Sequence, residues 1–563
     1  MALAYQASAQ QIPPKREFRA VWIATINNID WPKYGSLRSQ DQQQQFRSML
    51  DRLQRSGINA VFVQIRPSAD AFYESSLEPW SEWLTGKQGH APTPFYDPLK
   101  FMVEETHARN IEFHAWINPY RAVANRQKAV LDDNHITKLK PDWFLDFGKL
   151  KIFNPGIPAA RQHIVRVVAD IISRYDVDGI HFDDYFYPYP SNEHSINDGS
   201  TYRKYGKGFS SKADWRRYNV DMLIKNVHEA IVKLKPRVKF GVSPYSVWRN
   251  SNLSAYGSAT KSGLTSYDHL YADVRNWLKN GWVDYVVPQL YHSTRHRGKP
   301  FKTLVSWWAN NVFNRHLYIG HATYRLFSEN QSKPWHTRKE LPAQVRYLRN
   351  FKEALGSAFY SSKAILKNQG SFRDSLQKEL YRYPALIPPM SWKDPVPPKT
   401  PAGATMMAQG KGTLIEWAHS GLASDGEKPN RYVVYRFRRG EKLNVEDPRQ
   451  IIGIVPASNN RFFDEYYQPE DGVTYAITAL DRMHNESTPL YFNWEASKAR
   501  QELLAEAKRE EKLERRKKTR LDSAYDITYE QAAYFYQLAV ESSEKYVDVI
   551  EEVRPVAPAD MAD

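Results

Sequence analysis

The sequence contains no cysteine, which excludes disulfide bonds, thiolate zinc sites and a cysteine nucleophile. It also lacks any run of about 18 apolar residues, so we expect no transmembrane segment. The N-terminus lacks the basic and long apolar regions of a signal peptide, although Ala7-Ser8-Ala9 resembles a signal-peptidase site. We therefore interpret residues 1–15 as a signal remnant or disordered N-terminus of an exported protein.

The charge is strongly positive and unevenly spread. The net charge is +15, and the stretch from Lys498 to Arg520 holds ten Lys or Arg against five Glu. Such a balance indicates an anionic partner, which could be nucleic acid, a membrane surface or an acidic polymer. No recognisable nucleic-acid-binding module accompanies the charge, so we expect no nucleic-acid partner. We interpret residues 496–563 as a charged helical tail.

One pattern recurs from residue 19 to about residue 362: a β-rich run, a loop and then a segment of helical periodicity. Strands are expected at residues 19–26, 59–65, 111–118, 179–186, 239–245, 285–291, 317–323 and 357–361. Helices are expected at residues 42–56, 98–110, 159–175, 212–234, 267–279, 302–314 and 342–355. This alternation predicts an α/β fold, a closed (β/α)8 TIM barrel over residues 16–385. The main alternative is a doubly wound open sheet, but no Gly-rich phosphate-binding turn follows the first strand.

The remainder of the chain is predicted to be all-β before the tail. A Pro-rich linker spans residues 386–395, and short strands are expected at residues 412–417, 432–437, 450–455 and 474–480. Trp417 on an early strand, followed by YVVYR and TYAITALD, looks like a fibronectin type III domain. Residues 396–495 are therefore predicted to form a small sandwich of this type, acting as a spacer or scaffold.

Aromatic and polar side chains gather where the predicted barrel strands end. In this fold the active site lies at the C-terminal ends of the strands. Ring faces can pack on the CH faces of sugars, and planar polar groups can bond their hydroxyls. We therefore predict a polysaccharide partner. The candidate substrate-binding residues are Arg66, Asp70, Trp116, Asn118, Arg121, Tyr185, Tyr245, Gln289, Tyr291 and His321.

Asp183 and Asp184 are the candidate catalytic residues. Adjacent side chains on a strand point to opposite faces, so both reach one ligand only where the strand ends. At close range they repel, which raises one pKa and provides a general acid at neutral pH. The alternative is that one Asp is functional and the other caps a loop. Because the sixth and seventh strands end without Asp or Glu, the pattern favours a mechanism that uses this pair and the 2-acetamido oxygen of the substrate.

Four long motifs carry a resemblance to a known family. The motifs are EFRAVWIAT (residues 17–25), QIRP (64–67), HAWINPYR (114–121) and GIHFDDYFYP (179–188). They resemble glycoside hydrolase-like family ten over residues 15–384, a family that includes a bacterial enzyme cutting peptidoglycan strands stripped of peptides. The resemblance implies a barrel hydrolase without a cofactor, located in the periplasm or cell envelope and acting on a cell-wall or related polysaccharide. It transfers Asp183 and Asp184, with Arg66, Asn118 and Arg121 as ligand-binding candidates.

The arrangement is separately similar to barrel N-acetylhexosaminidases that use substrate assistance. That similarity implies that Asp183 orients the acetamido group and that Asp184 is the acid. Tyr291 would then bond the developing oxazoline.

Two other functions are compatible with the sequence. Asp183 and Asp184 with His292 and His296 superficially match metal-dependent polysaccharide deacetylases, which would lose activity on chelation and regain it with zinc. Against this, the two motifs lie on the fourth and sixth strands, whereas the Asp-Asp motif of the deacetylases opens their domain. Arg295 and Arg297 also flank His296, where they would repel a metal dication. We therefore expect no catalytic metal. The second alternative is a barrel that binds carbohydrate without catalysis.

Overall fold

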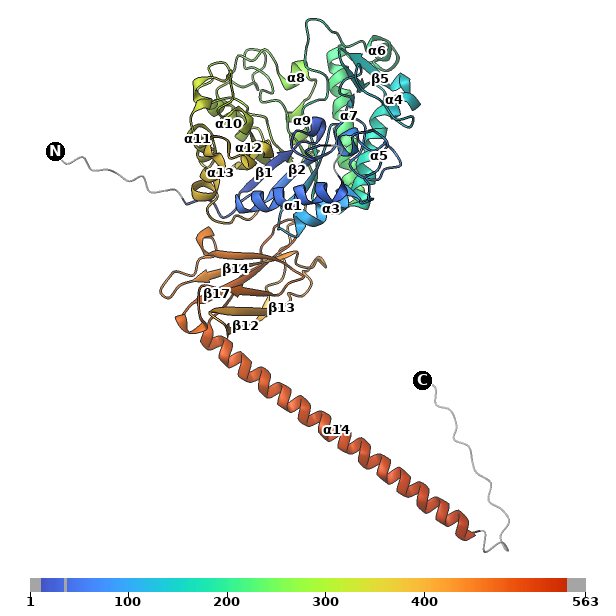
Figure 1. Ribbon diagram of the computed structural model, residues 1–563, viewed down its shortest axis with the longest axis vertical. Helices are drawn as coiled ribbons and strands as arrows, with labels where there is room; N and C mark the ends of the chain where they lie inside the picture. Colours follow the sequence, from blue (N-terminus) through green and yellow to red (C-terminus); the bar gives the residue numbers. More distant parts are fainter. Residues whose placement is uncertain (1–11, 35–37, 544–563) are drawn as a thin grey trace, which may run out of the picture. The chain divides into compact units, whose positions relative to one another are not determined.

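The computed structural model describes residues 12–34 and 38–543 (Figure 1), so most of the interpreted signal remnant lies outside the described residues. Eight parallel strands close into a barrel in the order β1-β11-β10-β9-β8-β7-β3-β2. They are β1 (Phe18–Ile23), β2 (Ala60–Arg66), β3 (Glu112–Ile117), β7 (Gly179–Phe182), β8 (Lys239–Val242), β9 (Tyr285–Val286), β10 (His316–Ala322) and β11 (Ala354–Tyr360). Each expected barrel strand overlaps one of these. The open-sheet alternative is wrong because β1 pairs with both β2 and β11.

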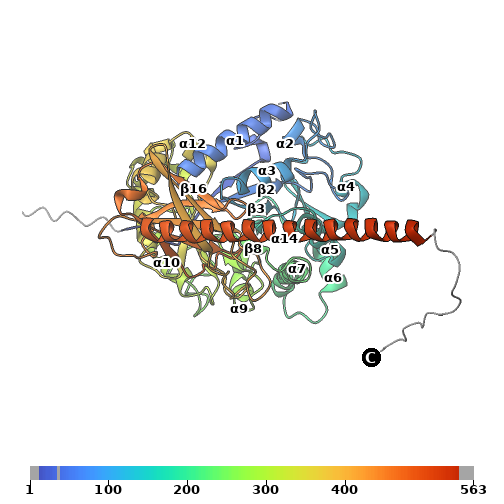
Figure 2. The same cartoon turned by 90° about the horizontal axis from the view of Figure 1, so that it is seen from below.

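Helices surround the barrel on its outside (Figure 2). The longer ones are α1 (Ser39–Arg55), α3 (Pro98–His107), α5 (Pro158–Arg174), α7 (Lys212–Leu234), α10 (Phe301–Ala309) and α11 (Glu340–Leu348). The expected helix at residues 267–279 is instead two, α8 (Ser266–His269) and α9 (Val274–Lys279), because Tyr271 between them has a positive φ of 53°. Short helices are α2 (Glu82–Thr85), α4 (Ile136–Leu139), α6 (Gly199–Tyr205), α12 (Ser362–Leu366) and α13 (Phe372–Ser375).

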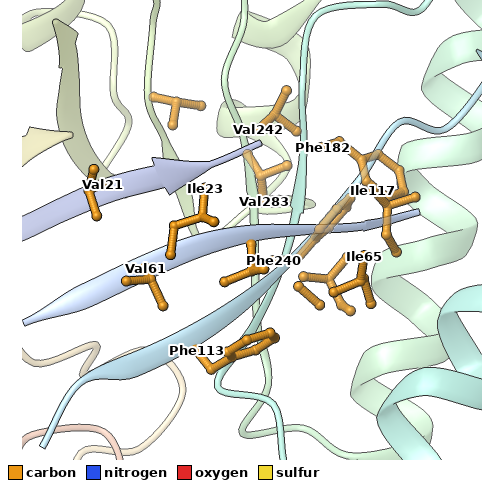
Figure 3. Close-up of a cluster of buried hydrophobic side chains, with 14 of the residues drawn as sticks. Val21, Ile23, Val61, Ile65, Phe113, Ile117, Phe182, Phe240, Val242 and Val283 are labelled. Carbon is orange, nitrogen blue, oxygen red and sulfur yellow. The ribbon is translucent and has the colours of Figure 1, made fainter. Parts of the chain in front are cut away.

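Alternating side chains divide the barrel core into two layers. Val21, Val61 and Phe113 belong to the buried cluster that also contains Phe46 and Leu50 of α1 (Figure 3). Side chains of the opposite phase form a second cluster, which contains Phe18, Trp22, Phe62, Tyr285 and Tyr318. His181 stacks on Phe62 and so belongs to this second, inward phase. Asp183, two residues beyond His181, continues that phase past the end of β7.

Three short antiparallel strands that the sequence pattern did not predict interrupt the βα repeat. They are β4 (Arg121–Val123), β5 (Phe144–Phe147) and β6 (Leu150–Phe153), paired in the order β4-β6-β5. Because β4 begins shortly after β3 and pairs with β6, this small sheet adjoins the C-terminal end of β3.

The segment after the barrel forms two antiparallel sheets. One has the order β12-β13-β16 and the other β15-β14-β17-β18. The strands are β12 (Ala402–Gln409), β13 (Gly412–Ala418), β14 (Arg431–Phe437), β15 (Ile451–Pro456), β16 (Arg461–Asp464), β17 (Thr474–Leu480) and β18 (Leu490–Phe492).

Helix α14 (Trp494–Ser543) belongs to a separate compact unit, residues 493–563. Its described side chains are largely exposed, and Arg515 pairs with Glu511 one turn earlier. Among the described residues, no helix combines the length and apolar character that crossing a membrane requires.

A buried charge cluster joins the two β-rich regions at the N-terminal ends of the barrel strands. Glu112, the first residue of β3, accepts hydrogen bonds from Lys239 Nζ and, at 2.6 Å, from His484 Nε2 of the C-terminal sheets. All three side chains are at most 3% exposed. Although burial opposes ionisation, Lys239 and His484 hold the pKa of Glu112 well below its usual range.

Glu112→Gln tests how much this cluster stabilises the fold. The substitution leaves the Lys239 ammonium buried without its carboxylate, which should cost about 3–5 kcal/mol of unfolding free energy. Urea unfolding followed by circular dichroism measures the loss. Glu229→Gln, which removes an exposed partner of Lys225, is the control and should change stability by less than about 0.5 kcal/mol. Equal midpoints for the two variants would contradict the importance of the cluster.

Candidate active site

A cavity of about 620 Å³ opens at the C-terminal ends of the barrel strands. Residues from the ends of all eight strands, and from the loops after them, meet around it. Its polar and aromatic lining consists of Trp22, Asn27, Gln64, Trp116, Arg121, Asp183, Tyr185, Phe186, Tyr189, Ser243, Gln289, Tyr291, Tyr324 and Tyr360. Ile26, Ile29, Ala124, Leu150, Ile152 and Pro188 complete the wall.

Asp183 lies directly after β7 with its carboxyl group in the cavity wall. Its Oδ2 accepts hydrogen bonds from Asn118 Nδ2 and, at 3.3 Å, from Trp116 Nε1. The backbone N–H of Tyr185 lies 3.5 Å from Oδ1. Burial raises the pKa of Asp183 to about 7, with repulsion from Asp184 in the same direction and attraction to Arg121 opposing it. This carboxyl group therefore titrates near neutral pH.

Asp184 is also buried, 2% exposed, but its hydrogen bonding differs. Its Oδ2 accepts the hydroxyl of Tyr189, whereas Oδ1 has no hydrogen-bond donor within the described part of the chain. Burial raises its pKa, and the nearby Tyr189 and Gln289 side chains oppose that shift. Asp184 does not itself line the cavity, but both of these neighbours do. The strand end thus holds two carboxyl groups whose pKa values are both raised by burial.

Two groups of aromatic rings face this cavity. Tyr185, 40% exposed, stacks on Tyr189 at a centroid distance of 5.7 Å, and the Arg121 guanidinium lies 4.6 Å from the Tyr185 ring. Tyr291, Tyr324 and Tyr360 form the other group, with centroids 6.0–6.1 Å apart. Flat apolar faces beside hydroxyl and guanidinium groups are suited to binding a sugar chain.

A chain of hydrogen bonds fixes Asp183 from below. Gln64 Nε2 donates to Asn118 Oδ1 at 2.5 Å, and Asn118 in turn donates to Asp183. Arg66 is fully buried, paired with Glu78, and donates to the backbone carbonyl of Asn118 at 2.7 Å. Arg66 and Asn118, predicted to bind ligand, are thus positioned behind the cavity wall. In this structure they orient the carboxyl group rather than line the cavity.

Three further predicted binding residues also do not line the cavity. Asp70 is buried and accepts the backbone N–H of Ser68, and burial raises its pKa to about 6. His321 is buried between Gln344 and Ser357, at 2.8 and 3.1 Å, and burial lowers its pKa to about 4. Tyr245 accepts a hydrogen bond from Lys299 Nζ at 2.9 Å, and its ring meets the edge of Tyr189.

Several lining residues were not among the predicted candidates. Trp22 lies near the end of β1, Ser243 directly follows β8 and Tyr360 ends β11, so counting the inward phase of these strands could have found them. Tyr189 lies in the loop five residues after Asp184, where no periodicity indicates direction. Leu150 and Ile152 come from the unpredicted β6.

The histidines of the deacetylase alternative lie elsewhere. His292 Nε2 is 2.9 Å from Ser246 Oγ, its ring lies 5.0 Å from that of His296, and neither histidine lines the cavity. Among the described residues, one group of three acidic, His or Cys side chains has the spacing to hold a metal ion. This group contains neither Asp183 nor His292. The arrangement of side chains therefore does not match a zinc site built on this motif.

Comparison with known proteins agrees with this geometry. The family described as Glycosyl hydrolase-like 10 matches residues 17–337. The chain is 41% identical over 493 residues to the glycosyl hydrolase YngK of Bacillus subtilis, covering 86% of this chain and 94% of that protein. It is 41% identical over 346 residues to the glycosyl hydrolase DigH of Escherichia coli K12, covering 58% and 77%. The chain belongs to the glycosyl hydrolase-like 10 family and is a glycoside hydrolase.

Proposed function

We propose that the protein hydrolyses O-glycosidic bonds in a bacterial cell-wall or related polysaccharide of amino sugars, such as peptidoglycan glycan strands. The observation that carries the proposal is the adjacent pair Asp183 and Asp184, buried at an aromatic cavity in which Asp183 is the one carboxylate among the described lining residues. Two-carboxylate glycosidases use groups about 5–10 Å apart, usually on different strands. With no partner across the cavity, the 2-acetamido oxygen of the substrate is the nucleophile that fits.

The hydrogen bonds distinguish the roles of the two carboxyl groups. Asp183 accepts from Asn118 and Trp116, as an ionised group would, and can also accept the acetamido N–H. Asp184 has an oxygen without a donor, which can carry a proton while Oδ2 accepts from Tyr189. In the reaction Asp184 gives its proton to the leaving oxygen as the acetamido oxygen bonds to C1. Asp184 then takes a proton from the water that opens the oxazolinium ring, and Tyr291 bonds that ring.

We also propose an organisation and location for the chain. The barrel occupies residues 16–385, a linker 386–395, a fibronectin type III-like sandwich 396–495 and a charged helical tail 496–563. Sheets of three and four antiparallel strands support the sandwich. An exported protein of the periplasm or cell envelope would meet this substrate, and the barrel needs no cofactor for the reaction.

Asp184→Asn and Asp183→Asn separate the two roles. Loss of the acid should reduce kcat/KM on natural glycan by about 10²- to 10⁴-fold, and much of the loss should return on an aryl glycoside whose leaving group needs no protonation. Asp183→Asn should impair both substrates alike, because it disturbs the nucleophile. The measurement is kcat/KM of both variants on both substrates in one buffer.

If only Asp183→Asn depends on the leaving group, the roles are exchanged. If both variants keep nearly full rate, the pair is not catalytic.

Trp116→Phe tests the electrostatics of Asp183. Removing the indole donor destabilises the ionised carboxylate, so its pKa should rise above about 7. Since the proposed mechanism needs ionised Asp183, activity falls as pH drops through this pKa, and the acidic limb of kcat/KM against pH should move to higher pH. The control is Trp307→Phe on α10, which loses an indole hydrogen bond to the backbone carbonyl of Tyr256 and should leave the limb unmoved. A shift to lower pH, or none, would contradict the assignment.

A further inference from the structure

A second cluster of carboxylates lies in the C-terminal sheets, separate from the catalytic cavity. Asp394 follows the barrel, Glu427 lies between β13 and β14, and Asp481 follows β17. Each offers an oxygen, and these oxygens lie within 4.8 Å of one another. The side chains are 6%, 6% and 1% exposed, respectively. Three carboxylates have thus been brought together from distant segments and removed from water.

The protein balances the charge of this cluster only in part. Arg237, half-exposed, pairs with Glu427, whereas the ion pairs of the described residues include neither Asp394 nor Asp481. Asp481 accepts hydrogen bonds from the backbone and side-chain amides of Asn485, at 2.9 and 2.8 Å, and these neutral donors bring no positive charge. Buried carboxylates without counter-charges cost several kcal/mol each unless a proton or a cation joins them.

Asp394 supplies an independent sign of a missing partner. Its Oδ1 accepts the backbone N–H of Val396 at 2.9 Å, but its Oδ2 is buried without any hydrogen-bond donor in the part of the chain that the structure describes. A buried, unsatisfied carboxylate oxygen is uncommon in native proteins. An ion bound between the three carboxylates would satisfy it.

We propose that Asp394, Glu427 and Asp481 form a Ca²⁺ site. All three donors are hard oxygens, which suit Ca²⁺ and not the softer transition metals. Oxygens bound to one Ca²⁺ at about 2.3–2.6 Å can lie up to about 5 Å apart, so the observed spacing fits. The remaining ligands would be water or backbone carbonyls.

The ion would tie the C-terminal sheets to the barrel. Asn485 connects two of the ligands, since its side chain also donates to the backbone carbonyl of Asp394 at 2.8 Å. Between Asp481 and Asn485 lie Arg482, which pairs with Asp178, and His484, which donates to Glu112. Fixing this short segment therefore fixes two contacts with the barrel, so the site should stabilise the fold without taking part in hydrolysis.

The test uses the full chain, freed of metal with a chelator and titrated with CaCl2 by calorimetry near pH 7.5. Saturable binding of one Ca²⁺ and a Tm several degrees higher with Ca²⁺ than with chelator are expected, because a ligand of the native state stabilises it. Asp481→Asn and Asp394→Asn should each weaken Ca²⁺ binding by at least about tenfold and abolish the Tm shift. Glu470→Gln, at an exposed acid of the same region, is the control and should keep both.

Hydrolysis by the folded protein at room temperature should not depend on the ion, which separates this site from the catalytic one. The wild-type titration decides the matter even if a variant fails to fold. Absence of both binding heat and Tm shift would overturn the proposal. Stability that rises as the pH falls through about 6 would then identify a shared proton, consistent with the raised pKa of Asp481.

Discussion

The burial of two neighbouring carboxyl groups at the end of β7 is the constraint around which the candidate active site is organised. Removing Asp183 and Asp184 from water raises the pKa of each, and their mutual repulsion adds to the effect for Asp183. The surrounding donors offset this cost unequally, since Asn118 and Trp116 both donate to Asp183, whereas one oxygen of Asp184 has no donor among the described residues. The two side chains therefore stand in different hydrogen-bonding environments, which under the proposed mechanism lets them perform different steps.

The barrel holds Asp183 and the side chains that donate to it in fixed positions. The inward phase of β2, β3 and β7 brings Gln64, Trp116 and Asp183 to the same cavity wall. Behind them, the buried pair of Arg66 and Glu78 holds the backbone at Asn118, which fixes the donor to Asp183. Most of the aromatic rings around the opening follow the strand ends, whereas Tyr360 ends β11, and Tyr189 ties its loop to the carboxyl pair by donating to Asp184.

Much of this architecture follows from the sequence pattern alone. Strand alternation identified all eight barrel strands, whereas the expected strand at residues 179–186 was too long, because β7 ends at Phe182, directly before Asp183 and Asp184. His321 could have been excluded as well, because it shares the outward phase of Ile319, which packs in the outer core. Arg66 could not have been excluded in this way. A register shift between Gln64 and Arg66 in the pairing of β2 with β3 breaks the alternation of inward and outward side chains there.

The remaining errors concern loops and partners distant in sequence. Tyr189 reaches Asp184 through a turn that no periodicity describes, and β4, β5 and β6 are too short to stand out from loops. The contact between His484 and Glu112 spans more than half of the chain, so only the folded structure shows it.

Participation of the substrate's acetamido group is the central claim, and a series of substrates with successively fluorinated N-acetyl groups tests it most directly. Fluorine withdraws electrons from the amide oxygen and makes it a poorer nucleophile while changing its size little. The proposed mechanism predicts that kcat/KM falls with each added fluorine on one leaving group. A rate that is independent of fluorination would contradict it and would require a nucleophile supplied by the protein or by water.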